Sequence, residues 1–357
     1  MTSKLRVAVL FGGQSTEHDV SILSARNVIK AIDVDKYEIV PILIDRAGQW
    51  LLIEQVDGTL PDPIAYAGIK VCLIPGGRGR LLAFGGPAGS SELLAMDILF
   101  PVLHGMHGED GSVQGFAQIA GVPLVGCGIL GSAIAIDKDV AKRLLREAGL
   151  PVARSIAVRS GESPIFEDVT NMLGSPIFVK PARQGSSVGV SKARTAGEFH
   201  VALAEAFKFD TKVLVEEFVQ AREIECAVLE GPDGAIVVSV AGEIVTGEGH
   251  GFYTYEAKYL DEKGATINIP AELPEQTAQH LQDMAREAFV ALGCEALARV
   301  DFFVRPDMST VINEVNTMPG FTDISMYPKA MAASGTSYPE LIDRLIEHGL
   351  ARARRAA

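Results

Sequence analysis

Polar side chains near the C-terminus have types and spacing that suit a divalent cation. The segment RVDFFVRPDMSTVINEVN has two β-rich runs around a turn sequence and predicts a β-hairpin. With the turn centred between residues 307 and 308, Asp301 lies opposite Glu314, and Arg299 lies opposite Asn316. Opposed residues share a sheet face, with Cβ atoms about 5 Å apart. Two carboxylates and an amide would then converge, and such oxygen donors favour Mg²⁺ completed by bound phosphates.

The alternative for this hairpin is a solvated sheet face on which Arg299 neutralises one acid. The register is an assumption, because a turn of odd length would shift the pairing by one residue. The hairpin register therefore decides between a cation site and an ordinary charged surface.

A second candidate site lies in the segment PIFVKPARQGSSVGV. A predicted strand ends in Lys180, and the glycine-serine loop 185–189 follows. Backbone N–H groups of such a loop can surround phosphate oxygens, to which the lysine adds a point charge. The chain has no GxxxxGK[ST] motif, so this is not a P-loop of that type. The alternative is a plain connection between two strands.

Two glycine-rich segments bring polar groups to the ends of predicted strands. HGMHGEDGSVQG places His104, Glu109 and Asp110 where open α/β sheets bind ligands, although Asp110 is equally suited to capping the next helix. Metal binding by His104 and His107 is disfavoured, because their neighbours lack helical spacing. In FGGQSTEHDVS, Glu17 is placed either to bind an ammonium group or to complement a helix N-terminus.

The segment HGFYTYEAKYL concentrates three tyrosines beside Lys258 in a chain poor in aromatic residues. A lid loop that closes over a ligand fits this composition. A tyrosine-rich strand packed on a core is the alternative.

The elements that must position these groups alternate between strands and helices. A strand at 5–11, a glycine pair, a helix and a strand at 37–44 predict a parallel α/β layer. The glycine-rich stretch 75–90 is expected to be a loop. Later predicted elements are helices at 137–148, 196–208, 275–292 and 338–348, and strands at 152–158, 176–180 and 212–217.

One motif points to a different chemistry. Gly126–Gly131 reads GCGILG and satisfies the GxGxxG dinucleotide pattern. It does not follow the first strand, and no acid ends a strand about 20 residues later. A nicotinamide-binding site is therefore disfavoured.

Composition restricts the class of protein. The 357 residues are 48% hydrophobic and carry a net charge of −13, which disfavours nucleic acid and anionic membrane as partners. Four cysteines lie far apart without a CxxC pair, as expected for reduced thiols in a cytoplasm. No apolar stretch approaches the roughly 18 residues of a membrane span. The chain is therefore expected to be a globular cytoplasmic protein.

Seven motifs in order resemble the D-alanine–D-alanine ligases, a family of ATP-grasp enzymes, along nearly the whole chain. They are GGQSTEHDVS, HGMHGEDGSVQG, KPARQGSSVGV, EEFVQAREIE, FYTYEAKYL, RVDFF and NEVNTMPGFTDIS. The resemblance implies ATP-dependent joining of two D-alanines through a D-alanyl phosphate, for peptidoglycan precursors. The alternatives are another ATP-grasp carboxylate–amine ligase with a different acceptor, and a catalytically silent nucleotide-binding module.

The resemblance also implies the architecture, an α/β fold of the ATP-grasp type with three domains. An N-terminal parallel-sheet α/β domain would span 1–126, a central ATP-binding lid 127–219, and a C-terminal catalytic domain 220–357. ATP would lie between the last two. Relatives of this family are usually homodimers, so a homodimer is expected.

For ATP and its metal, the resemblance implies a set of binding residues. The phosphate contacts are Lys138, Lys180, Ser186, Ser187 and Lys258. The base and ribose contacts are Glu216, Glu217, Val219 and Glu223. The Mg²⁺ ligands are Asp301, Glu314 and Asn316, which agrees with the hairpin above; two ions are expected, and Mn²⁺ is an expected substitute.

For the amino acids, the resemblance implies that Glu17 binds the ammonium of the first D-alanine, with His104 nearby. Glu17, Ser186 and Tyr259 would form a hydrogen-bonded triad. Arg299 and the Gly320 N–H would form the oxyanion hole. Ser325, the Met326 N–H and Lys258 would lie near phosphate or the second carboxylate. Thr254 and Ala221 depart from residues common in the family, and neither is a proposed catalytic group.

Overall fold

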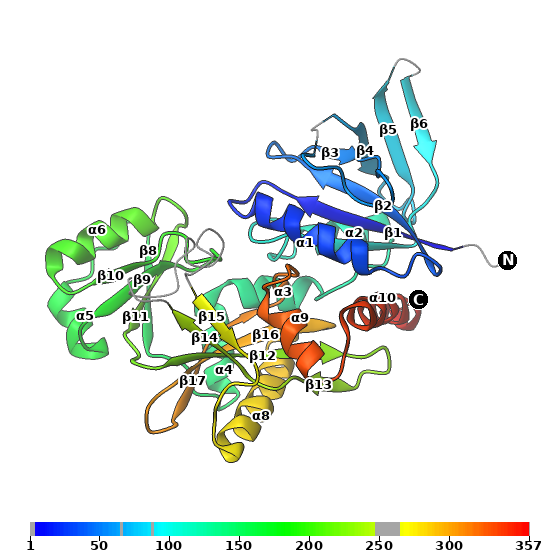
Figure 1. Cartoon of the computed structure of the whole chain (residues 1–357). Helices are drawn as coiled ribbons and strands as arrows, with labels where there is room; N and C mark the ends of the chain where they lie inside the picture. Colours follow the sequence, from blue (N-terminus) through cyan, green and yellow to red (C-terminus); the bar gives the residue numbers. More distant parts are fainter. Residues whose placement is uncertain (1–3, 65–66, 87–88, 247–264, 357) are drawn as a thin grey trace.

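The computed structural model describes residues 4–64, 67–86, 89–246 and 265–356 (Figure 1). These residues form three sheets that follow one another along the chain. In Figure 1 the first sheet is blue to cyan, the second is green, and the third runs from yellow-green to orange. Tyr259 and Lys258 lie outside the described residues. None of the described helices is long and apolar enough to cross a membrane.

The first sheet has seven strands in the order β6-β5-β4-β3-β2-β1-β7. Only β2, β1 and β7 run parallel, and the other neighbours are antiparallel. The predicted parallel layer is therefore confined to three strands of a mixed sheet. The strands are β1 (Leu5–Gly12), β2 (Tyr37–Ile44), β3 (Trp50–Leu52), β4 (Ile69–Leu73), β5 (Leu81–Gly86), β6 (Gly89–Leu93) and β7 (Ile98–Val102), with helices α1 (His18–Ala31) and α2 (Ser112–Ala120).

The expectation of a loop over 75–90 holds for residues 75–80 and is wrong beyond them, because β5 and the start of β6 lie there as an antiparallel pair. The glycine content of this stretch hid a short alternating strand. Leu81 and Ala83 are buried against the sheet core, whereas their neighbour Leu82 is half-buried. Period-two burial of this kind is the pattern of a strand with one covered face.

The second sheet is antiparallel, in the order β10-β9-β11-β8. Helices cover it, and Phe199 and Val213 are fully buried in its core. The elements are β8 (Ser155–Arg159), α5 (Phe166–Leu173), β9 (Ile177–Pro181), β10 (Ser191–Ala193), α6 (Ala196–Ala206) and β11 (Lys212–Glu217). The strands and the later helix predicted here are confirmed to within a few residues.

The third sheet runs β15-β14-β12-β16-β17, with β13 paired to β12. Its strands are β12 (Arg222–Glu230), β13 (Ile236–Val238), β14 (Gly242–Thr246), β15 (Ala265–Asn268), β16 (Leu297–Val304) and β17 (Thr310–Asn316). The helices that accompany it are α3 (Ile129–Ile136), α4 (Lys138–Glu147), α8 (Glu275–Ala291), α9 (Met326–Ala333) and α10 (Tyr338–Ala356). Helix α4 contacts both β17 and α8, so the third sheet receives elements from two parts of the chain.

Candidate active site

Two cavities meet where the three sheets approach one another. The larger has a volume of about 490 Å³ and the smaller about 290 Å³. Both are lined by Lys138, Gly185, Ser186 and Glu314. Ligands in the two cavities would therefore both contact these four residues.

The smaller cavity collects the residues expected to bind ATP. Those within the described part of the chain that line it are Lys138, Lys180, Ser186, Ser187, Glu216, Glu217, Val219 and Glu223. Its floor is aromatic, because Phe178, Phe218 and Phe303 also line it. These rings were not predicted from the sequence, although Phe178 lies two residues before Lys180 on β9 and therefore shares a sheet face with it.

The phosphate-type loop follows directly from β9. Lys180 lies at the end of this strand, and its Nζ is 2.9 Å from Glu216 Oε2 and 3.4 Å from Asn313 Oδ1. Ser186 and Ser187 have φ values of 49° and 60°, in the left-handed region that non-glycine residues seldom adopt. Strain of this kind concentrates at ligand-binding loops. The left-handed backbone therefore favours a ligand-binding loop over a plain strand connection.

Lys138 reaches the boundary of the two cavities from the start of α4. Asp137 caps this helix by accepting from the Val140 N–H. The Lys138 ammonium donates to the Gln184 carbonyl at 2.7 Å and lies 3.3 Å from Glu314 Oε2. One lysine therefore connects the glycine-serine loop to the C-terminal hairpin.

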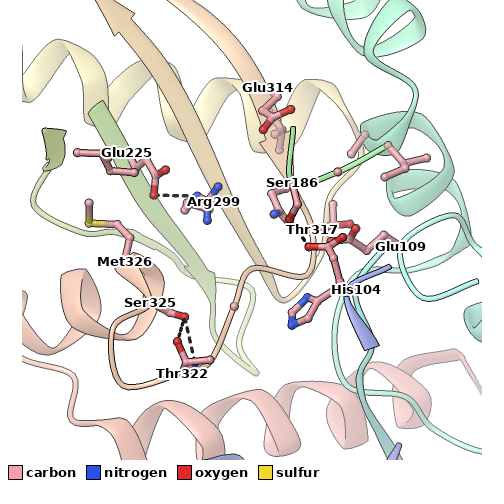
Figure 2. A pocket seen from close by; sticks show the side chains of 18 of the residues that line it. His104, Glu109, Ser186, Glu225, Arg299, Glu314, Thr317, Thr322, Ser325 and Met326 are labelled. Atoms are coloured by element: carbon pink, nitrogen blue, oxygen red, sulfur yellow. Dashed lines mark hydrogen bonds and ion pairs between the residues drawn. The ribbon is translucent and has the colours of Figure 1, made fainter. Parts of the chain in front are cut away.

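The larger cavity collects the residues expected to bind the amino acids. Glu17, His104, Arg299, Gly320, Ser325 and Met326 all line it. Figure 2 shows Arg299 beside Glu225 in one part of this cavity, and His104 and Glu109 in another.

Glu17 connects the first and second sheets. It precedes α1 but makes no side-chain capping hydrogen bond. Its carboxylate instead accepts a hydrogen bond from the Ser186 hydroxyl. Glu17 therefore lies at the start of α1, where its carboxylate complements the helix N-terminus, and it also contacts Ser186 across the cavity. The expected third member of this triad, Tyr259, lies outside the described residues.

Two buried titratable groups lie beside Glu17. His104 is hydrogen-bonded to the Met318 carbonyl at 3.1 Å and to Ser24 Oγ at 3.3 Å, and burial lowers its pKa although Glu17 opposes this. Glu109 accepts from the Gly105 N–H at 2.8 Å, and burial followed by repulsion from Glu17 raises its pKa to about 8. At neutral pH this corner therefore holds a neutral imidazole and a protonated carboxyl.

The loop after β7 also resolves two weaker hypotheses. Asp110 accepts from the N–H groups of Ser112 and His107 at 2.9 Å, as expected if it organises the start of α2. His104 is buried, whereas the side chain of His107 is exposed and lines neither cavity. The two imidazoles therefore do not face the same space.

The hairpin register pairs Asp301 with Glu314 and Arg299 with Asn316, as predicted. The reason differs from the one assumed. Beyond residue 301 the pairs are shifted by one, so the turn has odd length, and a β-bulge between residues 312 and 314 restores the predicted register. Asn313 is the extra residue, and it lines the smaller cavity beside Glu314.

The oxygen donors on this sheet face already have protein partners. Arg299 forms a two-pronged ion pair with Asp301 at 2.7 Å and contacts Glu225 Oε2 at 2.9 Å. These carboxylates raise the pKa of Arg299 above its usual value although burial opposes them. Asp301 lines neither cavity, whereas Glu225, opposite it on β12, lines the larger one. Glu225 was not predicted from the sequence, although it lies two residues after Glu223 on β12 and therefore shares a sheet face with it.

The donor set of Asp301, Glu314 and Asn316 fits Mg²⁺ in chemical kind. All three offer oxygen, and Asn316 Oδ1 accepts from the Met318 N–H at 2.9 Å. Within the described ranges, no group of three or more His, Cys, Asp or Glu side chains is arranged to hold a metal ion. Only two of these donors are carboxylates, so phosphate oxygens would have to complete the shell.

The loop before α9 presents the last predicted groups. Ser325 is the N-cap residue of α9, and its Oγ accepts from the Thr322 N–H at 3.0 Å (Figure 2). Met326 is the first residue of the helix, so its N–H has no partner within the helix. A Cβ at Gly320 would lie 2.7 Å from Ser325 Oγ, which explains the glycine.

The GxGxxG segment has a structural role. Gly128 is the N-cap residue of α3, and a Cβ there would lie 2.3 Å from the Glu295 carboxylate. Gly131 is similarly close to Cys127 and to the Gly293 carbonyl. No residue of this motif is among the described residues that line the two cavities. These glycines allow α3 to pack closely.

The chain is similar to known proteins over its whole length. Residues 6–127 match the family model described as D-ala D-ala ligase N-terminus, and residues 144–347 match D-ala D-ala ligase C-terminus. A curated relative, D-alanine–D-alanine ligase A of Brucella suis, is 56% identical over 98% of this chain and 99% of its own.

Solved structures give the same result. The D-alanine–D-alanine ligase of Coxiella burnetii matches with a TM-score of 0.86 and 35% identity over 99% of this chain and 96% of its own. The VanG D-Ala:D-Ser ligase of Enterococcus faecalis gives 0.85 and 35% over 97% and 100%. The Bacillus anthracis ligase complexed with ATP gives 0.74 and 26% over 99% and 100%. With both family models matched in order, this chain belongs to the D-alanine–D-alanine ligase family and has the ATP-grasp fold.

Proposed function

We propose that this chain joins two D-alanine molecules to D-alanyl-D-alanine, with ATP converted to ADP and phosphate. One observation carries the proposal: two cavities share the wall formed by Lys138, Gly185, Ser186 and Glu314. A ligase of this kind must bring a nucleotide phosphate against an amino-acid carboxylate, and a shared wall supports that contact.

In the first step, a carboxylate oxygen of the first D-alanine attacks the γ-phosphorus of ATP, and ADP leaves. A carboxylate is a poor electrophile at neutral pH, and the resulting acyl phosphate has a good leaving group. Lys138, Lys180, Ser187 and the N–H groups of the loop bind the phosphates. Glu216, Glu217, Val219 and Glu223 hold the base and ribose against the aromatic floor.

Asp301, Glu314 and Asn316 would hold Mg²⁺, and Mn²⁺ is an expected substitute. When bound, the metal neutralises charge on the transferring phosphate. Arg299 and Lys138, which now contact Asp301 and Glu314, would share these carboxylates with it. Two ions are proposed, because γ-phosphate transfer commonly uses more than one.

In the second step, the amine of the second D-alanine attacks the acyl carbon and the amide bond forms. The bond from the acyl carbon to the bridging oxygen breaks, and inorganic phosphate leaves with that oxygen. Glu17 and His104 orient the first amino acid, and Ser325 with the Met326 N–H binds the second carboxylate. Arg299 and the Gly320 N–H stabilise the tetrahedral oxyanion; losing one such donor typically costs about 3 kcal/mol. Either Ser186 or Tyr259 relays the proton that the amine loses, and Lys258 assists at the phosphate.

We further propose the setting of this reaction. Its product is a precursor of peptidoglycan made in the cytoplasm, where ATP is available. The four cysteines of the described chain are free thiols, which is compatible with that compartment. A homodimer, and domain boundaries at 126/127 and 219/220, remain proposals from the family resemblance.

An assay of ADP release with D-alanine against L-alanine tests the proposal. We expect activity with D-alanine and none with L-alanine. Adding D-serine or D-lactate as the second substrate tests the acceptor, since relatives include a D-Ala:D-Ser ligase. The resemblance implies that Tyr259 favours an amide product, because relatives that make D-alanyl-D-lactate tend to lack a tyrosine at this position. Preference for D-lactate would therefore contradict this assignment. Phosphate release with some other amino acid alone would indicate a different ATP-grasp ligase.

A further inference from the structure

A buried carboxylate in the smaller cavity lies between two lysines. The Glu216 side chain, at the end of β11, is 2% exposed. Its Oε2 lies 2.9 Å from Lys180 Nζ, and its Oε1 lies 3.4 Å from Lys142 Nζ. Each carboxylate oxygen therefore has its own cation.

The two lysines differ in access to a ligand. Lys180 is one of the described residues that line the smaller cavity, and Lys142 lines neither cavity. The Lys142 side chain is 1% exposed and projects from α4, one turn after Lys138. A nucleotide can therefore approach Lys180, whereas Lys142 approaches the cavity only through Glu216.

The charges of this group depend on one another. Burial lowers the pKa of Lys142 to about 8, and Glu216 limits that fall. Lys142 and Lys180 together hold the pKa of Glu216 below its usual value although burial opposes them. An ionised carboxylate this deeply buried requires a cation, because an unpaired one is strongly disfavoured.

The ATP site proposed above changes this balance. Phosphate oxygens carry more negative charge than one carboxylate, and Lys180 already lies at the cavity surface beside Asn313. A lysine ammonium is a single point charge on a flexible stem, so it can move from one anion to another. When Lys180 turns to phosphate, Glu216 keeps only the cation behind it.

We infer that Lys142 is a positioning residue for the nucleotide: it keeps Glu216 ionised and fixed in the cavity wall while Lys180 exchanges that carboxylate for phosphate oxygens. The inference rests on the proposed ATP site. Without Lys142, Glu216 and the phosphates compete for one lysine. The loss falls on nucleotide binding, because Lys142 contacts Glu216, which lines the smaller cavity and not the larger one.

The charged groups that act on Lys142 come from three strands: Glu216 on β11, Lys180 on β9 and Glu314 on β17. Helix α3 has no titratable side chain, and the buried residues of α8 are apolar. Loss of the Lys142 proton near pH 8 is therefore expected to weaken ATP binding by the wild-type enzyme between pH 8 and 9.

The test compares Lys142→Met, Lys142→Arg and the control Arg143→Met in the ADP-coupled assay and by calorimetric titration with Mg-ADP. Arg143 is an exposed cation on the same helix. For Lys142→Met we expect the KM for ATP and the Kd for Mg-ADP to rise about tenfold or more, with kcat and the KM for D-alanine within about twofold. Arg143→Met should match wild type.

The pH profile separates positioning from general damage. We expect the wild-type KM for ATP to rise between pH 8 and 9, and Lys142→Arg to hold it low and flat. If Lys142→Met folds poorly, the double variant Lys142→Met/Glu216→Gln removes the unpaired charge and should fold, and its KM for ATP should no longer rise between pH 8 and 9. A flat wild-type profile, or unchanged Mg-ADP affinity in Lys142→Met, overturns the inference. Absence of D-alanine-dependent ADP release in wild type instead overturns the proposed function.

Discussion

At the scale of single residues, Glu109 shows how burial sets a charge state beside the reaction centre. Its pKa of about 8 means that the folded chain keeps a proton that the unfolded chain releases near pH 4.5. Between these values the unfolded state binds fewer protons, so this group makes stability fall as pH rises. Below pH 4.5 Glu109 is protonated in both the folded and the unfolded chain, so it adds no pH dependence to the stability.

Glu109→Gln should remove that dependence. The amide keeps an acceptor for the Gly105 N–H and cannot ionise. We expect the variant to gain stability relative to wild type as pH rises from 5 to 8, by at most about 1.4 kcal/mol per pH unit. Urea unfolding at several pH values measures this difference. The exposed control Glu147→Gln should follow wild type, and a pH-independent difference for Glu109→Gln would contradict the assignment.

Glu314 is the residue common to both cavities and to the proposed metal set. Glu314→Gln should lower phosphate release at least about 100-fold while thermal unfolding stays within a few degrees, because the amide keeps its shape and loses its charge. A malachite-green phosphate assay measures the loss. The exposed Glu287→Gln on α8 is the control. Full activity in Glu314→Gln would mean that the metal assignment is wrong.

At the scale of elements, the loop from β17 to α9 packs closely against the start of α9 because Gly320 has no side chain. Ser325 Oγ would lie 2.7 Å from a Cβ atom at Gly320, and it also accepts a hydrogen bond from the Thr322 N–H. The positions of the Gly320 and Met326 N–H groups, both proposed to contact substrate, therefore depend on the close approach of Gly320 to Ser325.

Gly320→Ala should displace Ser325 and misplace both N–H groups. We expect kcat to fall about 100-fold, as for loss of an oxyanion donor, with the KM for ATP within about twofold. Steady-state kinetics with each substrate varied separates these effects. Gly197→Ala in α6 meets no atom within 4 Å and serves as the matched control. Equal kcat in the two variants would exclude Gly320 from the oxyanion hole.

At the scale of the whole molecule, helix α10 holds the first and third sheets together. It contacts β7 and α1, and its Gly349 lets the Leu124 carbonyl approach an ideal Cβ position to 2.8 Å. Arg352 donates to the carbonyls of Gly126 and Leu124 at 2.9 and 2.8 Å and pairs with Glu295. Residues that line neither cavity therefore join the first sheet to the third.

Arg352→Ala should leave two backbone carbonyls without this donor. We expect unfolding free energy to fall by about 2 kcal/mol, with kcat/KM for D-alanine at 25 °C within about twofold. Chemical denaturation measures the unfolding free energy, and steady-state assays measure kcat/KM for D-alanine. Arg354→Ala, exposed on the same helix, should change neither. Equal stability in both variants would contradict the role of Arg352.

The sequence by itself determined the chemistry and most of the elements. Lys180 before GSS, and acids spaced across RVDFF and NEVN, predict a phosphate and oxygen-donor site, because local residue types fix what a group can bind. The order of seven motifs determined the family. Amphipathic helices such as α8 were also readable, since their apolar period depends only on neighbours in the chain.

Only the tertiary structure decided which groups share a space. The bulge at Asn313 restores a register that an odd turn would have broken, and turn length and bulge compensate only once β16 and β17 are paired. Lys142 was not predicted, because it gains its role from Glu216, a partner far along the chain. Burial likewise set the pKa values of Glu109 and Lys142, since desolvation depends on the whole surrounding fold and not on the residue type.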